Sequence, residues 1–171
     1  MDNQRLLVLS DTHGAASAFA AVLNWAKDIN PGAVAFLGDG VDDLKRAVNS
    51  TGFSCTWHII RGNNDIIFSI PESAVFDFSG HRFYICHGHR SNNERLAAIA
   101  HNNEADAALF GHTHVPFLET LNGVFLLNPG SIGRPRSNAG PTFAVIGCSP
   151  CIPLQAEFFN INAGSIKKCL Y

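Results

Sequence analysis

The sequence predicts an α/β protein in which two mixed β-sheets pack face to face, with helices on their outer sides. Three observations support this class. Strand-like apolar runs alternate with helical spacing in the first half of the chain, short runs separated by Gly, Pro and Asn follow in the second half, and neither a repeat nor a linker divides them. With 171 residues, 46% hydrophobic and 15% charged, the chain is expected to form a single domain over residues 1–171.

The chain opens with a predicted strand–helix–strand unit. The runs Arg5–Ser10 and Ala33–Leu37 are mostly apolar, as in strands that are buried on both faces. The segment between them has apolar residues at helical spacing, and Pro31-Gly32 should end the helix. Because a helix connects the two strands, they should be parallel. The apolar positions of the helix are Phe19, Val22, Leu23, Ala26 and Ile29.

The alternation continues with a short helix after Gly40, whose first turn would contain Asp42 and Asp43 near the positive end of the helix dipole. A strand, a hairpin turning at Gly80-His81 and a third helix with capping-box spacing should follow, so the sheet is expected to be mixed. In order, these segments are Cys55–Arg61, Val75–Ser79 with Arg82–Cys86, and Ser91–Glu94 leading a helix that reaches about Asn103.

The rest of the chain consists of short strand-like runs separated by turn residues, and these runs are typical of antiparallel strands. They are Ala107–Phe110, Pro116–Leu121, Val124–Leu127, Thr142–Gly147 and Leu154–Ile161.

Composition narrows the function classes. The net charge is -2 and the pI about 6.4, so the chain lacks the global basic field that drives sequence-independent nucleic-acid binding. The segment Met1–Arg5 lacks the features of a signal peptide, and no apolar run is long enough to span a bilayer. We therefore expect a cytoplasmic protein without a membrane partner, and the sequence is compatible with a homo-oligomer.

The cysteines do not favour a disulfide framework, because their number, five, is odd. Cys148 and Cys151 have the spacing of a redox or zinc motif. One such pair supplies only two of the four ligands of a structural zinc ion, so the pair is interpreted as structural.

Chemistry-bearing residues recur in short segments that directly follow predicted strands. Each segment alone is typical of an ordinary turn, but two spaced histidine pairs together with two carboxylate blocks are hard to assign to core packing. Together they predict a metal site, because carboxylate, imidazole and amide groups are metal ligands. The segments are Asp11-Thr12-His13, Gly38-Asp39-Gly40, Gly62-Asn63-Asn64-Asp65, His87-Gly88-His89 and Gly111-His112-Thr113-His114. His58, His81 and His101 lack this setting and are interpreted as structural or solvated.

In this order, the five blocks DTH, GDG, GNND, HGH and GHTH resemble the signature of calcineurin-like metallophosphoesterases, above all the small bacterial and archaeal phosphodiesterase branch. The turn Asn128-Pro129-Gly130-Ser131 resembles a later turn of that branch. The resemblance implies a four-layer αββα sandwich with metal ions at the strand ends.

The resemblance also implies a ligand set for two divalent ions. Asp11, His13 and His114 would hold one ion, and Asp39 would bridge to the other. The second ion would have Asn63, His87 and His112 as its further ligands. This mixture of oxygen and imidazole donors favours Mn, Ni, Fe, Co or Zn over Mg or Ca alone.

The implied mechanism is in-line attack on phosphorus by a hydroxide that bridges two ions about 3.5–4 Å apart. Asn63 and Asn64 are candidate catalytic residues, but larger family members have a histidine where this chain has Asn64, and an amide cannot act as a general acid near neutral pH. His89 is the candidate proton donor. Candidate phosphate contacts are Arg90, Arg134 and Arg136.

These residues favour hydrolysis of a small phosphodiester substrate. A phosphomonoester or nucleotide anhydride is the alternative within the same chemistry. A non-catalytic scaffold, as in the small retromer subunit, is the alternative from another class, and the complete ligand set of this chain counts against it.

Overall fold

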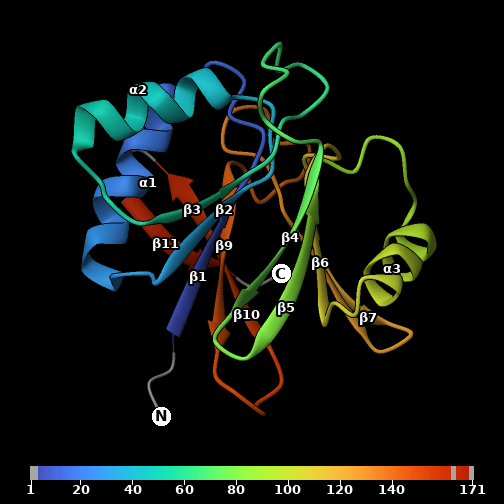
Figure 1. Ribbon diagram of the computed structural model, residues 1–171. Coiled ribbons are helices and arrows are strands. Elements are labelled where there is room, and N and C mark those ends of the chain that lie inside the picture. The colour runs from blue at the N-terminus through green and yellow to red at the C-terminus, as the bar shows by residue number, and fades with distance from the viewer. Residues whose placement is uncertain (1–3, 163–164, 170–171) are drawn as a thin grey trace.

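The computed structural model describes residues 4–162 and 165–169. Residues 1–3, 163–164 and 170–171 lie outside the described part, and so does most of the Met1–Arg5 segment considered above. The described chain forms four layers (Figure 1). Helices α1 (Ala16–Ile29) and α2 (Val41–Thr51) cover a six-stranded sheet, which packs on a five-stranded sheet that α3 (Asn93–Asn102) covers. The predicted αββα class is therefore confirmed.

Both sheets are mixed. The six-stranded sheet has the order β11 (Ser165–Cys169), β10 (Gln155–Asn162), β9 (Thr142–Cys148), β1 (Gln4–Leu9), β2 (Ala33–Phe36) and β3 (Thr56–Ile59). The five-stranded sheet has the order β4 (Ser73–Phe78), β5 (His81–Cys86), β6 (Ala107–Phe110), β8 (Val124–Pro129) and β7 (Pro116–Leu121).

Strand β1 is central to the fold because both of its faces are buried. Leu6 packs between the two sheets, whereas Leu7 packs toward α1 and α2. As predicted, β1 is parallel to β2, with Leu7 opposite Val34, and β2 is parallel to β3. On its other side β1 is antiparallel to β9, with Leu7 opposite Val145.

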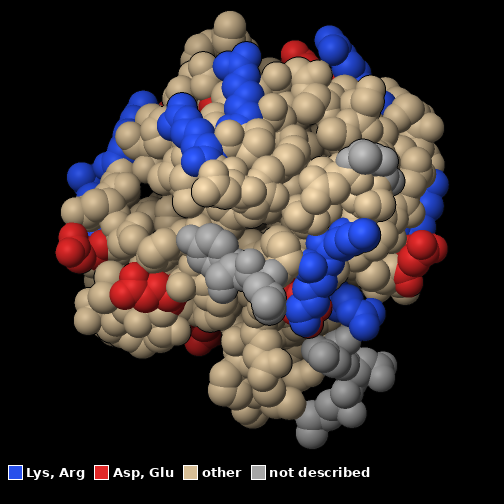
Figure 2. Space-filling view, turned by 180° about the vertical axis from the view of Figure 1, so that it is seen from behind, with Lys and Arg blue, Asp and Glu red and all other residues tan. Residues whose placement is uncertain are grey.

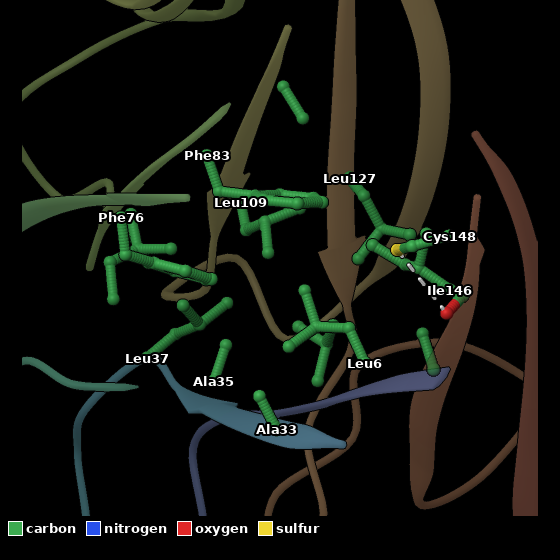
Figure 3. Packing of buried hydrophobic residues seen from close by; sticks show 14 of the residues in the cluster. Leu6, Ala33, Ala35, Leu37, Phe76, Phe83, Leu109, Leu127, Ile146 and Cys148 are labelled. Atoms are coloured by element: carbon green, nitrogen blue, oxygen red, sulfur yellow. Dashed lines mark hydrogen bonds between the residues drawn. The ribbon is translucent and has the colours of Figure 1, made fainter. Parts of the chain in front are cut away.

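The core between the sheets takes side chains from both of them (Figure 3). Leu6 and Ala35 approach from one sheet, and Phe83 and Leu109 from the other. Cys148 is part of this core, where burial raises the pKa of its thiol to about 12, while Cys151 is exposed. This placement agrees with the structural interpretation of the pair.

Two local predictions were wrong, and one strand was missed. Strand β6, which was expected to be antiparallel, is parallel to both β5 and β8. It is parallel to β5 because α3 forms a crossover between the two strands. The sequence did not indicate this direction, because a four-residue run that is buried throughout has the same pattern in either orientation. Strand β11 was not predicted, because it is a short polar edge strand. The cap of α3 is Asn92 instead of Ser91, since the Asn92 side chain accepts a hydrogen bond from the Arg95 N–H.

His81 and His101 have no place in the strand-end cluster. His81 begins β5, directly after the hairpin turn, and its Nε2 is 2.9 Å from the carbonyl oxygen of Ser149. His101 is exposed on α3. Both positions agree with the structural or solvated interpretation.

His58 packs between the sheets and makes stability dependent on pH. Its ring stacks on Phe76 with centroids 3.6 Å apart, and burial lowers its pKa. A depressed histidine pKa means that the unfolded chain binds the proton more tightly, so this contribution is complete above the unfolded pKa of about 6.5 and is lost as pH falls below it. We expect the unfolding free energy of the wild type, measured relative to that of His58→Phe, to decrease as the pH is lowered from about 8 to about 5. Urea titrations should measure this, and a constant difference would contradict it.

The charged side chains on the surface are distributed as the small net charge of the chain suggests. On the face shown in Figure 2, Lys and Arg side chains lie singly or in small groups among other residues. Among the described residues, no helix is long and apolar enough to cross a membrane.

Candidate metal centre

The predicted site residues follow strands from both sheets and meet at one end of the sandwich. Asp11 and His13 follow β1, Asp39 follows β2, and His87 follows β5. The loop between β3 and β4 rises at the same end, at the top of Figure 1. Parallel strands end at the same sheet edge, so the fold brings together side chains that are as much as 101 positions apart in the sequence.

Asp11, His13 and His114 form a first cluster. The Nε2 atoms of the two histidines are 3.1 Å apart. Asp11 Oδ1 is 3.2 Å from His114 Nε2 and 3.6 Å from His13 Nε2. The three residues have the ligand-atom proximity of a metal site, and Asp11 is completely buried.

A second cluster adjoins the first and shares a carboxylate with it. Asp39 Oδ2 is 3.3 Å from His87 Nε2 and 3.6 Å from His13 Nε2, so one oxygen lies between histidines of both clusters. Asp11 Oδ1 is 3.9 Å from His87 Nε2 and also belongs to this group. Asp39 therefore lies between histidines of both clusters, and Asp11 reaches both clusters as well. That Asp39 bridges two ions stays a prediction.

The donor atoms fit bound cations. Asp11 Oδ1 and His87 Nε2 are buried, and neither has a hydrogen-bond partner in the described part of the chain. Leaving such groups unpaired costs about 1–3 kcal/mol each, which a cation between them would offset. Ligand atoms about 2.1 Å from one ion are roughly 3.0–3.4 Å apart, close to the separations within each cluster.

Two histidines are held in the tautomer that a metal requires. Nδ1 of His87 lies 2.7 Å from the carbonyl oxygen of Leu37, and Nδ1 of His114 lies 2.7 Å from that of Arg134. A carbonyl only accepts, so each Nδ1 donates and carries the proton. In the neutral form of each ring, the Nε2 lone pair is therefore directed at the site, and a second proton on Nε2 must leave before a metal ion binds.

The charges of these groups are strongly coupled. Burial would raise the pKa of Asp11, but the neighbouring imidazoles of His114 and His13 outweigh it and lower the pKa to about 2. The pKa of Asp39 is also lowered, because His87 and Asn64 outweigh burial. Burial would lower the pKa of His87, but Asp39 and Asp11 raise it, and contact with Asp11 raises that of His114.

The backbone of the site is left-handed at several non-glycine positions. Five of the seven predicted ligands have φ between 43° and 68°. This conformation is unfavourable for residues with a side chain, and it persists at functional sites where the surrounding structure enforces it. The five are Asp11 (φ 54°), His13 (φ 43°), Asp39 (φ 58°), His112 (φ 68°) and His114 (φ 62°).

Asp65 fixes the loop that carries Asp39. Its carboxylate accepts four backbone hydrogen bonds, from the N–H groups of Asp39 (2.7 Å), Gly62 (2.8 Å), Gly40 (2.9 Å) and Val41 (3.0 Å). The last two N–H groups belong to the start of α2, so Asp65 caps that helix from a distant loop.

Asn64 holds the side chain of Asp39. Its backbone N–H donates to Oδ1 at 2.8 Å, and its side-chain amide donates to Oδ2 at 2.6 Å. Gly62 must approach Asp39 closely, because a β-carbon there would overlap Oδ1. The structure thus places Asn64 as a support of Asp39.

The remaining predicted ligands border the clusters. His112 lies beside His87, with ring centroids 5.3 Å apart, and its backbone N–H donates to Asp11 Oδ2 at 3.0 Å. Asn63 lines a cavity together with His112 and His114. His89 lies 5.7 Å from His87 and 6.0 Å from His112 by ring centroids, and burial lowers its pKa.

The candidate phosphate contacts separate into two groups. Arg134 and Arg136 line the same cavity as Asn63. Arg90 instead forms an ion pair with Glu72 at 2.9 Å, beside a smaller pocket that His89 also lines.

Sequence reasoning missed two supports of the metal-site loops. Asp43 Oδ2 accepts hydrogen bonds from the Thr12 hydroxyl and the Gly14 N–H, both at 2.7 Å. The Ser131 hydroxyl donates to the Asp11 carbonyl oxygen at 2.7 Å, which ties the NPGS turn to the first block. The position of Ser131 in that turn was the available signal, whereas an aspartate in the first turn of a helix has an ordinary electrostatic explanation.

The architecture and the two adjoining clusters define the class: a two-sheet sandwich with candidate metal ligands at its strand ends. Residues 5–150 match the model of the calcineurin-like phosphoesterase superfamily domain. The chain belongs to this superfamily, and the expectation of a metallophosphoesterase is confirmed.

Named relatives support this assignment. A probable metallophosphoesterase of Mycoplasma pneumoniae is 31% identical over 140 residues, which cover 78% of this chain and 82% of the relative. The phosphodiesterase YfcE of Escherichia coli K12 is 25% identical over 162 residues, covering 83% and 86%. The structure of Vps29 from Entamoeba histolytica, complexed with zinc, shares the fold with a TM-score of 0.77 at 22% identity, covering 96% and 97%.

Metal binding should release protons. His87 and His114, with raised pKa values, hold protons that an incoming cation must displace, so affinity should rise as pH increases from about 6 to 8. We expect two Mn²⁺ per chain by elemental analysis of loaded protein, with proton release shown by calorimetry in buffers of different ionisation enthalpy. Full loading with one ion or fewer per chain would contradict the two-ion site, and binding independent of pH would contradict the linkage.

Proposed function

We propose that this protein hydrolyses phosphodiesters at a centre of two divalent ions. The observation that supports this proposal best is the pair of adjoining clusters, which share Asp11 and contain buried ligand atoms without a hydrogen-bond partner in the described part of the chain. Asp39 Oδ2 also lies near a histidine of each cluster. The similarity to a relative named as a phosphodiesterase supports the choice of a diester.

The two clusters suggest how the ligands divide. Asp11, His13 and His114 would hold one ion, and His87, His112 and Asn63 the other, with Asp39 between them. Two bound cations would supply Lewis acidity, which polarises the phosphoryl group and lowers the pKa of a water for in-line attack on phosphorus.

The chain's own residues position the substrate and its charge. Arg134 and Arg136 line the cavity next to the clusters and can donate to non-bridging phosphate oxygens. Asn64 donates to Asp39 and has no acidic proton to give to a leaving group. His89 lies beside His87 and His112 and is the candidate proton donor.

A non-catalytic scaffold is the competing proposal, since Vps29, named for vacuolar protein sorting in another similar structure, shares this fold. Against it, carboxylates and histidines from four strand ends converge here, and Asn64 and Asp65 hold one of the carboxylates in place. A protein that served only as a scaffold would need the shape of this fold, but it would not need these polar groups to be buried together.

We expect the Mn²⁺-loaded or Ni²⁺-loaded protein to hydrolyse bis(p-nitrophenyl) phosphate faster than p-nitrophenyl phosphate. Asn64 cannot help to protonate a leaving alkoxide, so esters with acidic leaving groups should react best, and both test compounds have such a group. The diester should be the faster of the two because it carries one negative charge and still presents two oxygens to the metals. Release of p-nitrophenolate measures both reactions. Asn64→His should shift the preference toward the monoester. A wild type that prefers the monoester would contradict the diesterase proposal while leaving the two-ion hydrolase intact.

A further inference from the structure

Two cavities meet at the proposed metal centre. The larger is about 680 Å³ and the smaller about 450 Å³. Both sizes fall within the roughly 300–1,000 Å³ typical of small-molecule sites, so each has room for an organic group beside a phosphate. The residues common to both linings are His13, Asp39, Asn64 and Arg134.

The larger cavity has one polar wall and one apolar wall. The N-terminal part of α2 supplies the polar wall, including Asp42 and Lys45, which pair at 3.4 Å. The loop after β3 supplies Ile66 and Ile67 on the apolar wall. Ile67 packs against the core under α1 and α2, whereas the Ile66 side chain is 84% exposed.

The exposure of Ile66 points to a ligand with an apolar surface. An isoleucine so far exposed at the edge of a polar centre gains free energy if an apolar group covers it. Carboxylates outnumber cationic side chains along this cavity, which disfavours an anionic group there. The cavity therefore suits an uncharged organic group.

We propose that the larger cavity binds one ester substituent of a phosphodiester, an uncharged organic group that packs on Ile66, with the phosphate at the shared residues. The inference rests on the proposed function and specifies its substrate. A diester carries two substituents on one phosphorus, and the structure provides two cavities that meet at the shared residues. A monoester would use only one of them.

Binding of two diesters to the Mn²⁺-loaded protein tests the proposal by calorimetry. Diphenyl phosphate and dimethyl phosphate carry the same charge and differ only in their substituents. We expect the wild type to bind the diphenyl compound about five- to tenfold more tightly, and Ile66→Ser to abolish that preference. Phe68→Ser is the matched control, since Phe68 is 81% exposed on the same loop but does not line the cavity, and it should keep the preference.

Three results would overturn the subsite: failure of the wild type to prefer the diphenyl ester, an unchanged preference in Ile66→Ser, or equal loss in Phe68→Ser. Turnover separates this inference from the proposed function. If the preference for diphenyl phosphate depends on Ile66 but no aryl diester is hydrolysed, the proposed function is contradicted and the subsite is not. Diester hydrolysis with binding that is independent of Ile66 contradicts the subsite alone.

Discussion

Replacing Asp39 with alanine should lower diesterase activity by on the order of 10²-fold or more, and by more than His13→Ala does. One Asp39 oxygen lies 3.3 Å from His87 Nε2 and 3.6 Å from His13 Nε2, so its loss affects both clusters. His13 is predicted to be a terminal ligand of one ion only, so its loss should cost about tenfold. Initial rates at saturating Mn²⁺ measure both effects.

The two alanine variants are matched in backbone strain, because both residues have positive φ. Alanine in this region costs about 1–2 kcal/mol in either case. Asp39→Asn adds a control, since asparagine tolerates the conformation and preserves the shape while removing the charge. Equal residual rates for Asp39→Ala and His13→Ala would contradict the bridging position of Asp39.

Asp65→Ala should destabilise the fold by about 2–4 kcal/mol and also weaken metal binding. The substitution removes the common acceptor of four backbone N–H groups, two of which begin α2. The segment that carries Asp39 would then lose its three hydrogen bonds to Asp65 and keep those that Asn64, in the loop after β3, donates to Asp39. Chemical denaturation measures the first effect and Mn²⁺ titration the second.

Asp42→Ala is the matched control for this experiment. Asp42 also lies in the first turn of α2, but its side chain is 73% exposed and pairs with the exposed Lys45. Such a pair contributes about 0–1 kcal/mol, so this variant should remain near the wild type in both measurements. Loss of stability without loss of metal affinity in Asp65→Ala would restrict its role to capping the helix.

Much of the fold was predictable because burial leaves periodic patterns in the sequence. Apolar spacing predicted α1, the strands β1 and β2 and their parallel pairing. The order of the five blocks predicted that Asp11, His13, Asp39, His87 and His114 would meet, and the distances confirm that they do. The physical basis of this prediction is that these residues follow the ends of strands, because the loops that follow parallel strands lie at one edge of the sheet.

Other features depend on contacts that no local pattern encodes. The direction of β6 depends on α3 covering its outer face, and β11 has the alternating polarity of any exposed segment. The network of Asp65 joins groups as many as 26 residues apart, so its residue type alone indicates only a turn. The separation of Arg90 from Arg134 and Arg136 likewise appears only in three dimensions.

The pairing of β1 with β9 has a consequence for the order in which the chain folds. The strand–helix–strand unit at the start is local and can form early, but one edge of β1 stays open until residues 142–148 have been synthesised. During that interval an apolar strand presents unpaired backbone groups, which favours aggregation of truncated chains. His114, the last of the predicted ligands, is made when about two thirds of the chain has been synthesised, and Ser131, which supports Asp11, when about three quarters has been, so the site is assembled late.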